Sequence, residues 1–559
     1  MSAATTARYA GRLVLLVDET GRITSVADRR RPERTFLVDV ELEPAVVNGV
    51  TESWRDRVVG IDEDEIDITQ RGGDSLDADL RHSLSTGWAT RLLLVNSGAE
   101  PLAVDRLPLR VRPAPGQRVS AVAAGSRLCW AAQAEDGHGP LLTARLTTGT
   151  VAGIGPEHLE LGGLWLAPGQ RYVAQLRWEL LATPRSVVAG PGRDVLLART
   201  VYEVNEPAVL PEDPDAALVK PRDVAMDSFE EADFAGREIF APDPGRHQVE
   251  LRSAEGDVRW ELSWVHPLAA QLQEWAAVVL ARPRTPAGVV SIEDLPSAIV
   301  LQAALGAGGL EDVDDAADAL DLVTARLLDG LGSGPAASPL TVLYLLGEHG
   351  RTGDLDILDA AVARAEALMT RDGPPAPGLG LAVLRMVLAT ASTDLGPSAT
   401  SRVSSVVAQA VARVAARPAA GEGDGSGAAE VAGGSAATLD VIRRAAELEL
   451  LLAVQPLLPP DPTNREHTAE LVRALGAALG GGLPGRLLSP PPVTEHAYLV
   501  TVLRMLPESG YPEVTRSWGA PTPSLARQTT LEVLDRLTLG ADPEIGTAAA
   551  WLALVQRHD

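Results

Sequence analysis

The sequence contains very little cysteine, which excludes two kinds of stabilisation. Cys129 is the only cysteine among 559 residues, so the chain can form neither an intrachain disulfide nor a metal cage built from thiolates. Cys129 lies in the apolar run LCWAA. We expect it to be a buried, inert thiol, because a reactive thiolate needs an accessible and electropositive environment.

Positive charge is also scarce. Lys and Arg number 49 against 75 Asp and Glu, which gives a formal net charge of −26, and Lys220 is the only lysine. Binding to nucleic acid is therefore not expected, because phosphates must be neutralised by clustered Lys and Arg. No glycine-rich nucleotide-binding motif follows a predicted strand, and such a loop would lack its usual lysine.

Long apolar runs and paired histidines are missing as well. The N-terminal apolar run covers only residues 13–17, which is too short for a signal peptide or a membrane span. We therefore expect a cytoplasmic protein with no membrane partner.

The nine histidines include no H-E-x-x-H or other paired spacing, so neither a metal nor a cofactor is predicted. A G-x-S-x-G nucleophile elbow is absent too.

What the chain does contain is a change of hydrophobic period near residue 267. Before it, short alternating runs lie between Gly, Pro and Asp turns, which predicts an antiparallel β-sandwich. We assign residues 1–204 to a β-sandwich domain, and residues 205–267 to a Pro- and acid-rich strap with the last strands. The predicted strands are 13–17, 35–42, 90–95, 107–111, 141–146, 172–181, 195–204, 248–251 and 258–265.

After residue 267 the period is about 3.6, which predicts amphipathic helices throughout residues 268–559. Many of the predicted starts are Ser, Thr, Asp or Asn, whose side chains accept hydrogen bonds from the first amides of a helix. Residues 418–437 have no large apolar side chain and predict a flexible loop. The predicted starts are Leu268, Asp294, Asp312, Ser338, Asp354, Pro377, Ser398, Thr438, Asn464, Thr494, Thr522 and Asp542. Twelve helices suggest six hairpins closed into a toroid.

Three phrases of the sequence resemble a known architecture. Residues 91–111, RLLLVNSGAEPLAVDRLPLRV, and residues 166–180, LAPGQRYVAQLRWEL, resemble strand pairs of the mutarotase-like β-supersandwich that precedes the catalytic domain of several glycoside hydrolases. Residues 343–369 contain a helix, a TGD turn and a second helix, and they resemble the (α/α)6 toroids of glucoamylase-like and glycogen-debranching-like enzymes. The resemblance implies an antiparallel β-supersandwich followed by an (α/α)6 six-hairpin toroid.

The same resemblance implies a carbohydrate-active protein that acts on or binds an α-glucan or another oligosaccharide. Sugar rings stack on aromatic faces, yet only 4% of the residues are Phe, Trp or Tyr. Few of these aromatic residues follow residue 267, so the resemblance implies an eroded or unusual sugar site. Two further hypotheses stay open: a non-catalytic binding or assembly protein that retains the scaffold, and a toroid like that of class II terpene cyclases.

Glycoside hydrolysis needs two carboxylates, one as general acid and one as base or nucleophile. The best candidates are acids at predicted helix starts or in hairpin loops, where side chains can face the mouth of a toroid. They are Glu495, Glu293, Asp294 and Glu348, and His496, Tyr498 and Trp518 are the candidate substrate-binding residues. Each acid also has a structural interpretation, because acids in a first helical turn are favoured by the helix dipole.

Other motifs invite weaker hypotheses. Residues 312–315, DVDD, resemble the D-x-D-D motif in which the middle aspartate, here Asp314, protonates an alkene, but an acidic helix start explains them equally well. Acids in residues 61–67 and 72–80 suit Ca²⁺ ligation or a solvated acidic loop. Trp88 and Trp130 are either sugar platforms or core residues. The oligomeric state is left open.

Overall fold

The computed structural model describes residues 5–189, 197, 199–210, 217–219, 237–252, 258–330, 338–392, 397–415, 436–481, 486–507, 511–512, 522–540 and 545–556. Contacts between Cα atoms divide the chain into two units. The first unit holds the described residues up to Trp264 and the segment Gly476–Pro490, and the second begins at Val265. Residues 416–435, which include most of the predicted flexible loop, and much of the predicted strap lie outside the described residues.

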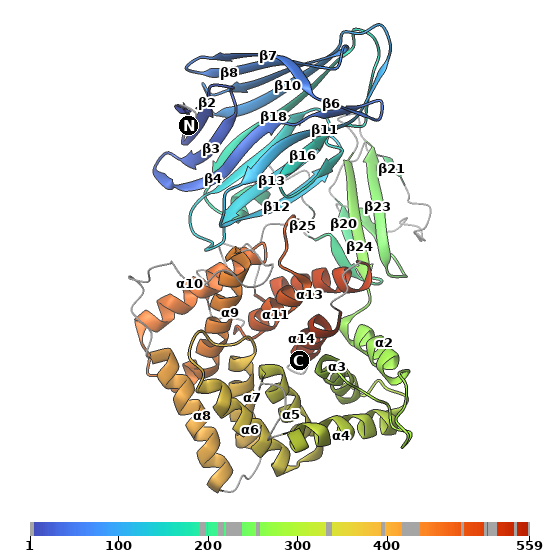
Figure 1. The fold of residues 1–559 in the computed structure, drawn as a ribbon, viewed down its shortest axis with the longest axis vertical. Helices are drawn as coiled ribbons and strands as arrows, with labels where there is room; N and C mark the ends of the chain where they lie inside the picture. The colour runs from blue at the N-terminus through green and yellow to red at the C-terminus, as the bar shows by residue number, and fades with distance from the viewer. Residues whose placement is uncertain are drawn as a thin grey trace. The chain divides into compact units, whose positions relative to one another are not determined.

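The first unit consists mainly of two large antiparallel sheets (Figure 1). One sheet has the path β1-β2-β3-β4-β11-β16-β15 with β17, β5 and β6 beside it. Its strands are β1 (Thr5–Ala10), β2 (Leu13–Asp18), β3 (Ile23–Asp28), β4 (Arg31–Leu42), β5 (Ala45–Val47), β6 (Val50–Glu52), β11 (Leu102–Pro113), β15 (Gly153–Ile154), β16 (His158–Leu161) and β17 (Leu164–Leu166).

The other sheet has the order β25-β12-β13-β14-β18-β10-β9-β8-β7. Its strands are β7 (Trp54–Ile61), β8 (Glu65–Gly72), β9 (Leu76–Ser83), β10 (Trp88–Asn96), β12 (Gln117–Ala124), β13 (Arg127–Ala134), β14 (Leu141–Thr148), β18 (Arg171–Leu181) and β25 (Arg486–Leu487). Helix α1 (Pro184–Ala189) follows β18, and β19 (Val201–Glu203), β20 (Ala208–Leu210), β21 (Ala217–Val219), β22 (Arg237–Ile239), β23 (Gly245–Arg252) and β24 (Val258–Val265) form two smaller sheets.

Alternate side chains of the two large sheets form one hydrophobic core, as the two-residue period of a strand requires. Trp88 and Trp178 stack in this core with ring centroids 4.3 Å apart, and Trp130 meets Trp178 edge-on at 5.9 Å. Trp88 and Trp130 are each only 1% exposed. Of the two interpretations of these tryptophans, the structure therefore supports the core role.

Residues 61–67 and 72–80 are part turn and part strand. Asp62, Glu63, Asp64 and Asp74 are exposed in turns, as a solvated acidic loop predicts. Residues 65–67, 72 and 76–80 instead belong to β8 and β9, which pair in register across eight residues. The alternate residues of β9 are buried, so acids such as Asp77 and Asp79 fall on the outward positions of a half-buried strand. In the described part of the chain, no group of three or more His, Cys, Asp or Glu residues is placed to hold a metal ion.

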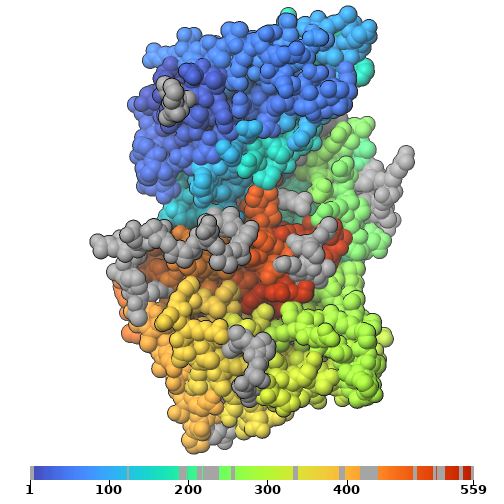
Figure 2. All heavy atoms as spheres, viewed as in Figure 1, coloured from blue at the N-terminus to red at the C-terminus, as the bar shows by residue number. Residues whose placement is uncertain are grey.

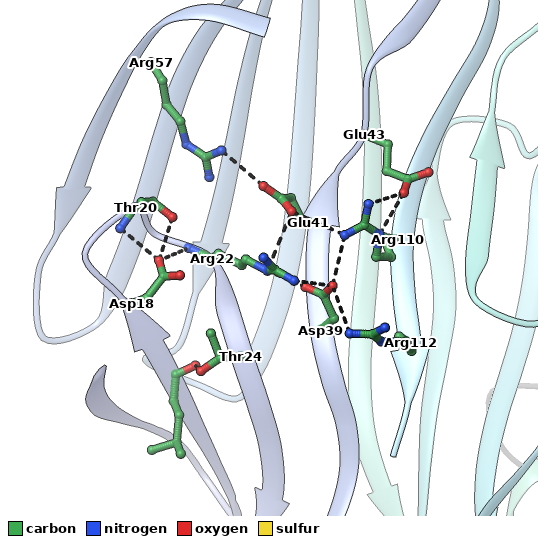
Figure 3. Close-up of polar contacts among 11 residues, drawn as sticks. Asp18, Thr20, Arg22, Thr24, Asp39, Glu41, Glu43, Arg57, Arg110 and Arg112 are labelled. Atoms are coloured by element: carbon green, nitrogen blue, oxygen red, sulfur yellow. Dashed lines mark hydrogen bonds and ion pairs between the residues drawn. The ribbon is translucent and has the colours of Figure 1, made fainter. Parts of the chain in front are cut away.

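Strands β3, β4 and β11 carry a charged network on their outward face (Figure 3). Asp39 is fully buried, and its carboxylate accepts hydrogen bonds from Arg22 Nε at 2.7 Å and Arg22 Nη2 at 2.6 Å. Arg110 Nη1 donates to the same carboxylate at 3.1 Å. Burial by itself raises the pKa of Asp39, but the hydrogen bonds from the two arginines hold that pKa below its ordinary value.

We expect Asp39→Asn to lower the free energy of unfolding by about 2 kcal/mol, because Arg22 and Arg110 would lose a buried anionic partner. Since the folded pKa of Asp39 is depressed, its stabilising contribution is present at neutral pH and is lost as the pH falls through the acid range. Urea unfolding at pH 7 and at acid pH measures both effects. Glu33→Gln, which changes an exposed acid on the same strand, is the control. An Asp39→Asn variant as stable as the parent at pH 7 would contradict this role.

The second unit is mainly helical in its described residues (Figure 1). Its twelve described α-helices are α2 (Leu268–Leu280), α3 (Leu295–Gly306), α4 (Val313–Asp329), α5 (Pro339–Thr352), α6 (Leu355–Met369), α7 (Leu379–Ser392), α8 (Pro397–Ala415), α9 (Ala436–Val454), α10 (Pro462–Ala478), α11 (Val493–Arg504), α13 (Thr522–Thr538) and α14 (Ile545–Gln556). The 3₁₀ turn η2 (Gln455–Leu457) follows α9. Each helix begins within three residues of a predicted start.

Six of these helices contact one another in a closed circuit, α3-α5-α7-α9-α11-α14 and back to α3. Among these six helices, α3 and α14 have the most apolar sequences. A helix that is apolar on most of its faces is expected to be packed on several sides. Gly380 of α7 lies so close to α9 that a Cβ atom would be 2.4 Å from the carbonyl carbon of Glu449. The run GLGLAV at residues 378–383 therefore lets α7 pack closely against α9.

Figure 2 shows one face of the molecule with all heavy atoms as spheres, coloured from blue at the N-terminus to red at the C-terminus. In the described part of the chain, no helix combines the length and the apolar sequence that a bilayer span requires.

Candidate functional site

The second unit contains an open cavity of about 480 Å³. Its lining comes from three neighbouring helices of the circuit, α3, α5 and α7, and each contributes residues from its C-terminal half or middle. The lining combines two guanidinium groups and one amide with three leucines and three glycines: Arg351, Arg385, Gln302, Leu305, Leu346, Leu388, Gly306, Gly347 and Gly350. None of the described lining residues is a carboxylate. Mixed linings with a few polar groups are typical of small-molecule sites.

Arg351 is held in place by two carboxylates. Its Nε and Nη2 atoms donate to Oε2 of Glu348 at 2.9 and 2.6 Å, and Nη2 also pairs with Asp321. Burial by itself lowers the pKa of Arg351, but the hydrogen bonds to Glu348 and Asp321 raise it above its ordinary value. The Arg351 side chain is still 23% exposed. The guanidinium is therefore a fixed, permanently charged donor at the cavity.

Gln302 is oriented by the same carboxylate. Its Nε2 atom donates to Oε1 of Glu348 at 2.5 Å and to the carbonyl oxygen of Tyr344 at 3.1 Å. The Tyr344 hydroxyl is itself bound, since it donates to the Leu320 carbonyl at 3.0 Å and lies 3.1 Å from the Thr324 hydroxyl. Glu348 is fully buried, so it acts here as the anchor of two side chains that line the cavity.

Arg385 brings a second guanidinium to the cavity from α7. Its Nη2 atom donates to the carbonyl oxygen of Leu554 on α14 at 2.8 Å, which ties two helices of the circuit together. Gly347 and Gly350 lie on α5 without side chains that could fill the space, and a Cβ atom at Gly350 would meet nothing within 4 Å. A ligand can therefore approach the helix backbone between the two arginines.

One of the four predicted catalytic acids, Glu348, lies apart from the two at the start of α3. Glu293 and Asp294 precede α3, and Glu495 lies in the first turn of α11. Glu348, in contrast, lies near the C-terminal end of α5, where it bonds to Gln302. Because an α-helix rises 1.5 Å per residue, the path along α3 from Asp294 to Gln302 is about 12 Å. Glu348 is thus far from Asp294 and cannot pair with it across one glycosidic bond.

Asp294 has a structural role that its sequence position predicted. Its Oδ1 atom accepts a hydrogen bond from the Ser297 amide at 2.8 Å, which caps α3, and its Oδ2 atom pairs with Arg282 Nη1 at 2.8 Å. Burial raises the pKa of Asp294, but these hydrogen bonds outweigh it and the pKa is lowered. The carboxylate is therefore ionised at neutral pH and is unsuited to donate a proton.

The remaining predicted residues lie in different settings. Glu293 is exposed and Glu495 is half-buried. His496 is 1% and Tyr498 is 2% exposed, so both are core residues in this conformation. Trp518 lies outside the described residues. Asp314 is exposed in the first turn of α4, while its neighbour Asp315 pairs with Arg284. None of these residues lines the cavity between α3, α5 and α7.

Sequence reasoning missed the carboxylate with the most perturbed pKa among the described acids, Glu449. It is fully buried on α9 and accepts three hydrogen bonds: from the Gly378 amide at 2.8 Å, the Leu381 amide at 2.9 Å and the Tyr498 hydroxyl at 2.7 Å. Burial raises its pKa to about 7, and the three donors only partly offset that effect. Glu449 therefore caps the N-terminus of α7 from a neighbouring helix.

Comparison with known proteins gives a likeness of fold. No protein-family model matches the chain, and no curated protein matches it in sequence. A solved polysaccharide lyase is similar over 95% of this chain and 93% of its own, with a TM-score of 0.66 and 11% identity. The chain shares its fold with that lyase. A structure of the COPII coat assembled on membranes has 9% identity over 99% of this chain and 82% of its own. Its TM-score of 0.10 shows no similarity of fold.

Proposed function

We propose that the chain is a carbohydrate-active protein that binds an acidic carbohydrate in the cavity between α3, α5 and α7. The observation that carries this proposal is the pair of guanidinium groups, Arg351 and Arg385, among the described residues that line the cavity. Guanidinium groups are suited to carboxylate and sulfate groups, because their N–H donors form charge-assisted hydrogen bonds with such anions.

The carbohydrate part of the proposal is supported by the fold. We infer that the helical unit is an (α/α)6 toroid preceded by a supersandwich, since six hairpins and a closed circuit of inner helices suit that architecture. A solved protein that is similar in fold to this chain is a polysaccharide lyase. Fold alone does not determine function, so the ligand class rests on the cavity as well. Its leucines suit the C–H faces of sugar rings, and its arginines and glutamine suit hydroxyl and carboxylate groups.

A panel of oligosaccharides tests the proposal. Oligogalacturonate, oligoalginate and hyaluronan fragments are titrated into the protein by calorimetry, with maltooligosaccharides of equal length as the neutral set. We expect at least one acidic ligand to bind about tenfold or more tightly than any neutral one, as one charge-assisted hydrogen bond would provide. Equal or tighter binding of the neutral α-glucans would contradict the acidic ligand and favour the α-glucan predicted from sequence.

Glycoside hydrolysis stays a prediction. Glu293 and Glu495, at the N-terminal ends of α3 and α11, are the predicted acids that remain accessible. The same panel tests hydrolysis. Hydrolysis of a glycosidic bond releases a new reducing end and no unsaturated sugar, whereas cleavage by elimination releases a new reducing end together with an unsaturated sugar. Binding without either product would favour the non-catalytic hypothesis.

A further inference from the structure

One indole in the described part of the first unit is exposed to solvent. Nine of the ten tryptophans are described, and among these only Trp165 is exposed, at 65% of its surface. The others are buried or half-buried. Tryptophan is highly buried on average because its ring is large and mostly apolar. An exposed indole on a strand, here Trp165 of β17 (Leu164–Leu166), is therefore a candidate surface for contact with a ligand.

The register of β17 holds this indole outward. In the strand Leu164–Leu166, Leu166 is buried in the core and Leu164 packs against it, so the two-residue period directs Trp165 to the other face. The strand is fixed at both ends: the buried Asn96 donates to the Leu166 carbonyl at 2.9 Å, and the Gly163 amide donates to the Asp105 carbonyl at 3.4 Å. The ring cannot turn into the core without displacing Leu166.

The surroundings of Trp165 leave the ring accessible and supply polar groups. Trp165 pairs with Ala103 of β11, whose side chain is a single methyl group. Asp105, two residues further along β11, is exposed, and its Oδ2 atom accepts a hydrogen bond from the Gly49 amide at 2.7 Å. An exposed flat apolar ring opposite a small side chain suits a pyranose, which has an apolar C–H face and a polar edge.

We propose that Trp165 is a stacking platform for a sugar ring of a polysaccharide chain, separate from the cavity of the helical unit. This inference rests on the proposed function, because it takes the ligand to be a carbohydrate. The two sites are distinguished by ligand length and by residue: short acidic oligosaccharides bind the cavity through Arg351 and Arg385, whereas the indole adds to the binding of polymers.

Affinity electrophoresis of the full chain in gels containing polygalacturonate, alginate, hyaluronan or amylose tests the platform. We expect Trp165→Ala to weaken polymer binding about five- to tenfold, the loss of one aromatic contact, and Trp165→Phe to weaken it less. Short oligosaccharides should bind both variants as they bind the parent. Val50→Ala, which removes a comparably exposed apolar side chain (58%), is the matched control and should bind normally.

Fluorescence supplies a second readout. The difference between the emission of the parent and that of Trp165→Phe isolates this indole, and we expect its emission to shift to the blue when polymer is added. Unchanged polymer binding by Trp165→Ala would overturn the platform and leave the cavity proposal standing. A parent protein that binds no polymer and no oligosaccharide overturns both. Dimerisation of the parent that Trp165→Ala abolishes would show that a second copy covers the indole, which also overturns the platform.

Discussion

Replacing Glu449 by alanine is expected to lower the free energy of unfolding by about 3 to 5 kcal/mol. The substitution leaves the Gly378 amide, the Leu381 amide and the Tyr498 hydroxyl without their acceptor in a fully buried place. An unsatisfied buried donor costs about 1 to 3 kcal/mol. Glu449→Gln should cost less, about 1 to 3 kcal/mol, because the amide keeps one acceptor oxygen but places an NH₂ group against a backbone N–H.

The pH dependence of unfolding separates these two variants further. The pKa of Glu449 is about 7 when folded and 4.5 in the unfolded reference, so between these values the folded state binds a proton that the unfolded state lacks. The protonated carboxyl of Glu449 therefore adds its full contribution to the free energy of unfolding below about pH 4.5, and this contribution is lost as the pH rises through 7. Glu449→Gln cannot titrate at this position. We expect the stability of the parent to fall relative to Glu449→Gln as the pH rises from 4.5 to 7.

Urea unfolding curves followed by circular dichroism at pH 4.5, 6 and 8 measure both effects. Glu447→Gln is the matched control, because Glu447 lies on the same helix and is half-buried beside His467. A Glu449→Gln variant whose stability follows the parent at every pH would show that the carboxyl does not titrate in this range. A Glu449→Ala variant as stable as the parent would contradict the conclusion that Glu449 caps α7.

Loss of both arginines of the cavity is expected to reduce the affinity for an acidic oligosaccharide by about 100-fold or more. Each charge-assisted hydrogen bond accounts for about 1.5 to 3 kcal/mol, or roughly tenfold to 100-fold. Arg351→Gln and Arg385→Gln alone should each show part of this loss. Affinity for a neutral oligosaccharide of the same length should change little, because its hydroxyl groups gain less from a formal charge.

Arg282→Gln is the matched control for these variants. It removes the same charge from the second unit, but Arg282 pairs with Asp294 at the opposite end of α3. Calorimetric titration of the four variants gives the affinities, and urea unfolding shows whether each variant is folded. If Arg351→Gln and Arg385→Gln bind the acidic ligand as tightly as Arg282→Gln does, the anion does not lie in this cavity.

The helical unit was largely predictable because its signals are local. Asp294, Ser338 and Asp354 were predicted as helix starts from their side chains alone, and each caps its helix through a hydrogen bond. Thr494 was wrong as a cap, because Pro492 occupies the N-cap position and the helix begins at Val493. The error is small because a 3.6-residue period fixes the helix even where the cap is misassigned.

The strands were less predictable, and the acidic ones were missed for a physical reason. In β8 and β9, Asp67, Asp77 and Asp79 alternate with buried apolar residues. Two acids at a spacing of two residues suggest a solvated loop when charge is considered, and a half-buried strand when alternation is considered. The pairing of β8 with β9 decides between these interpretations, and a partner strand is a non-local feature that a single segment does not reveal.

The candidate site was less predictable still. Gln302, Arg351 and Arg385 are far apart in the sequence. Arg351 lies in the phrase of residues 343–369, but that phrase predicted a helix, a turn and a second helix rather than a cavity. Glu348 was singled out as an acid near a loop, but what it contacts depends on α3 packing beside α5. Glu449 carried no signal in its own segment, because its partners Gly378 and Tyr498 come from two other helices. A buried network of this kind is visible only once the helices are assembled.

The most direct test of the account is a crystal structure of the protein soaked with the tightest acidic oligosaccharide of the panel. The account predicts a carboxylate or sulfate group within hydrogen-bonding distance of the Arg351 and Arg385 guanidinium groups, with a sugar ring against Leu305 or Leu388. An oligosaccharide that binds in solution but occupies another part of the protein, with this cavity left to solvent, would contradict it.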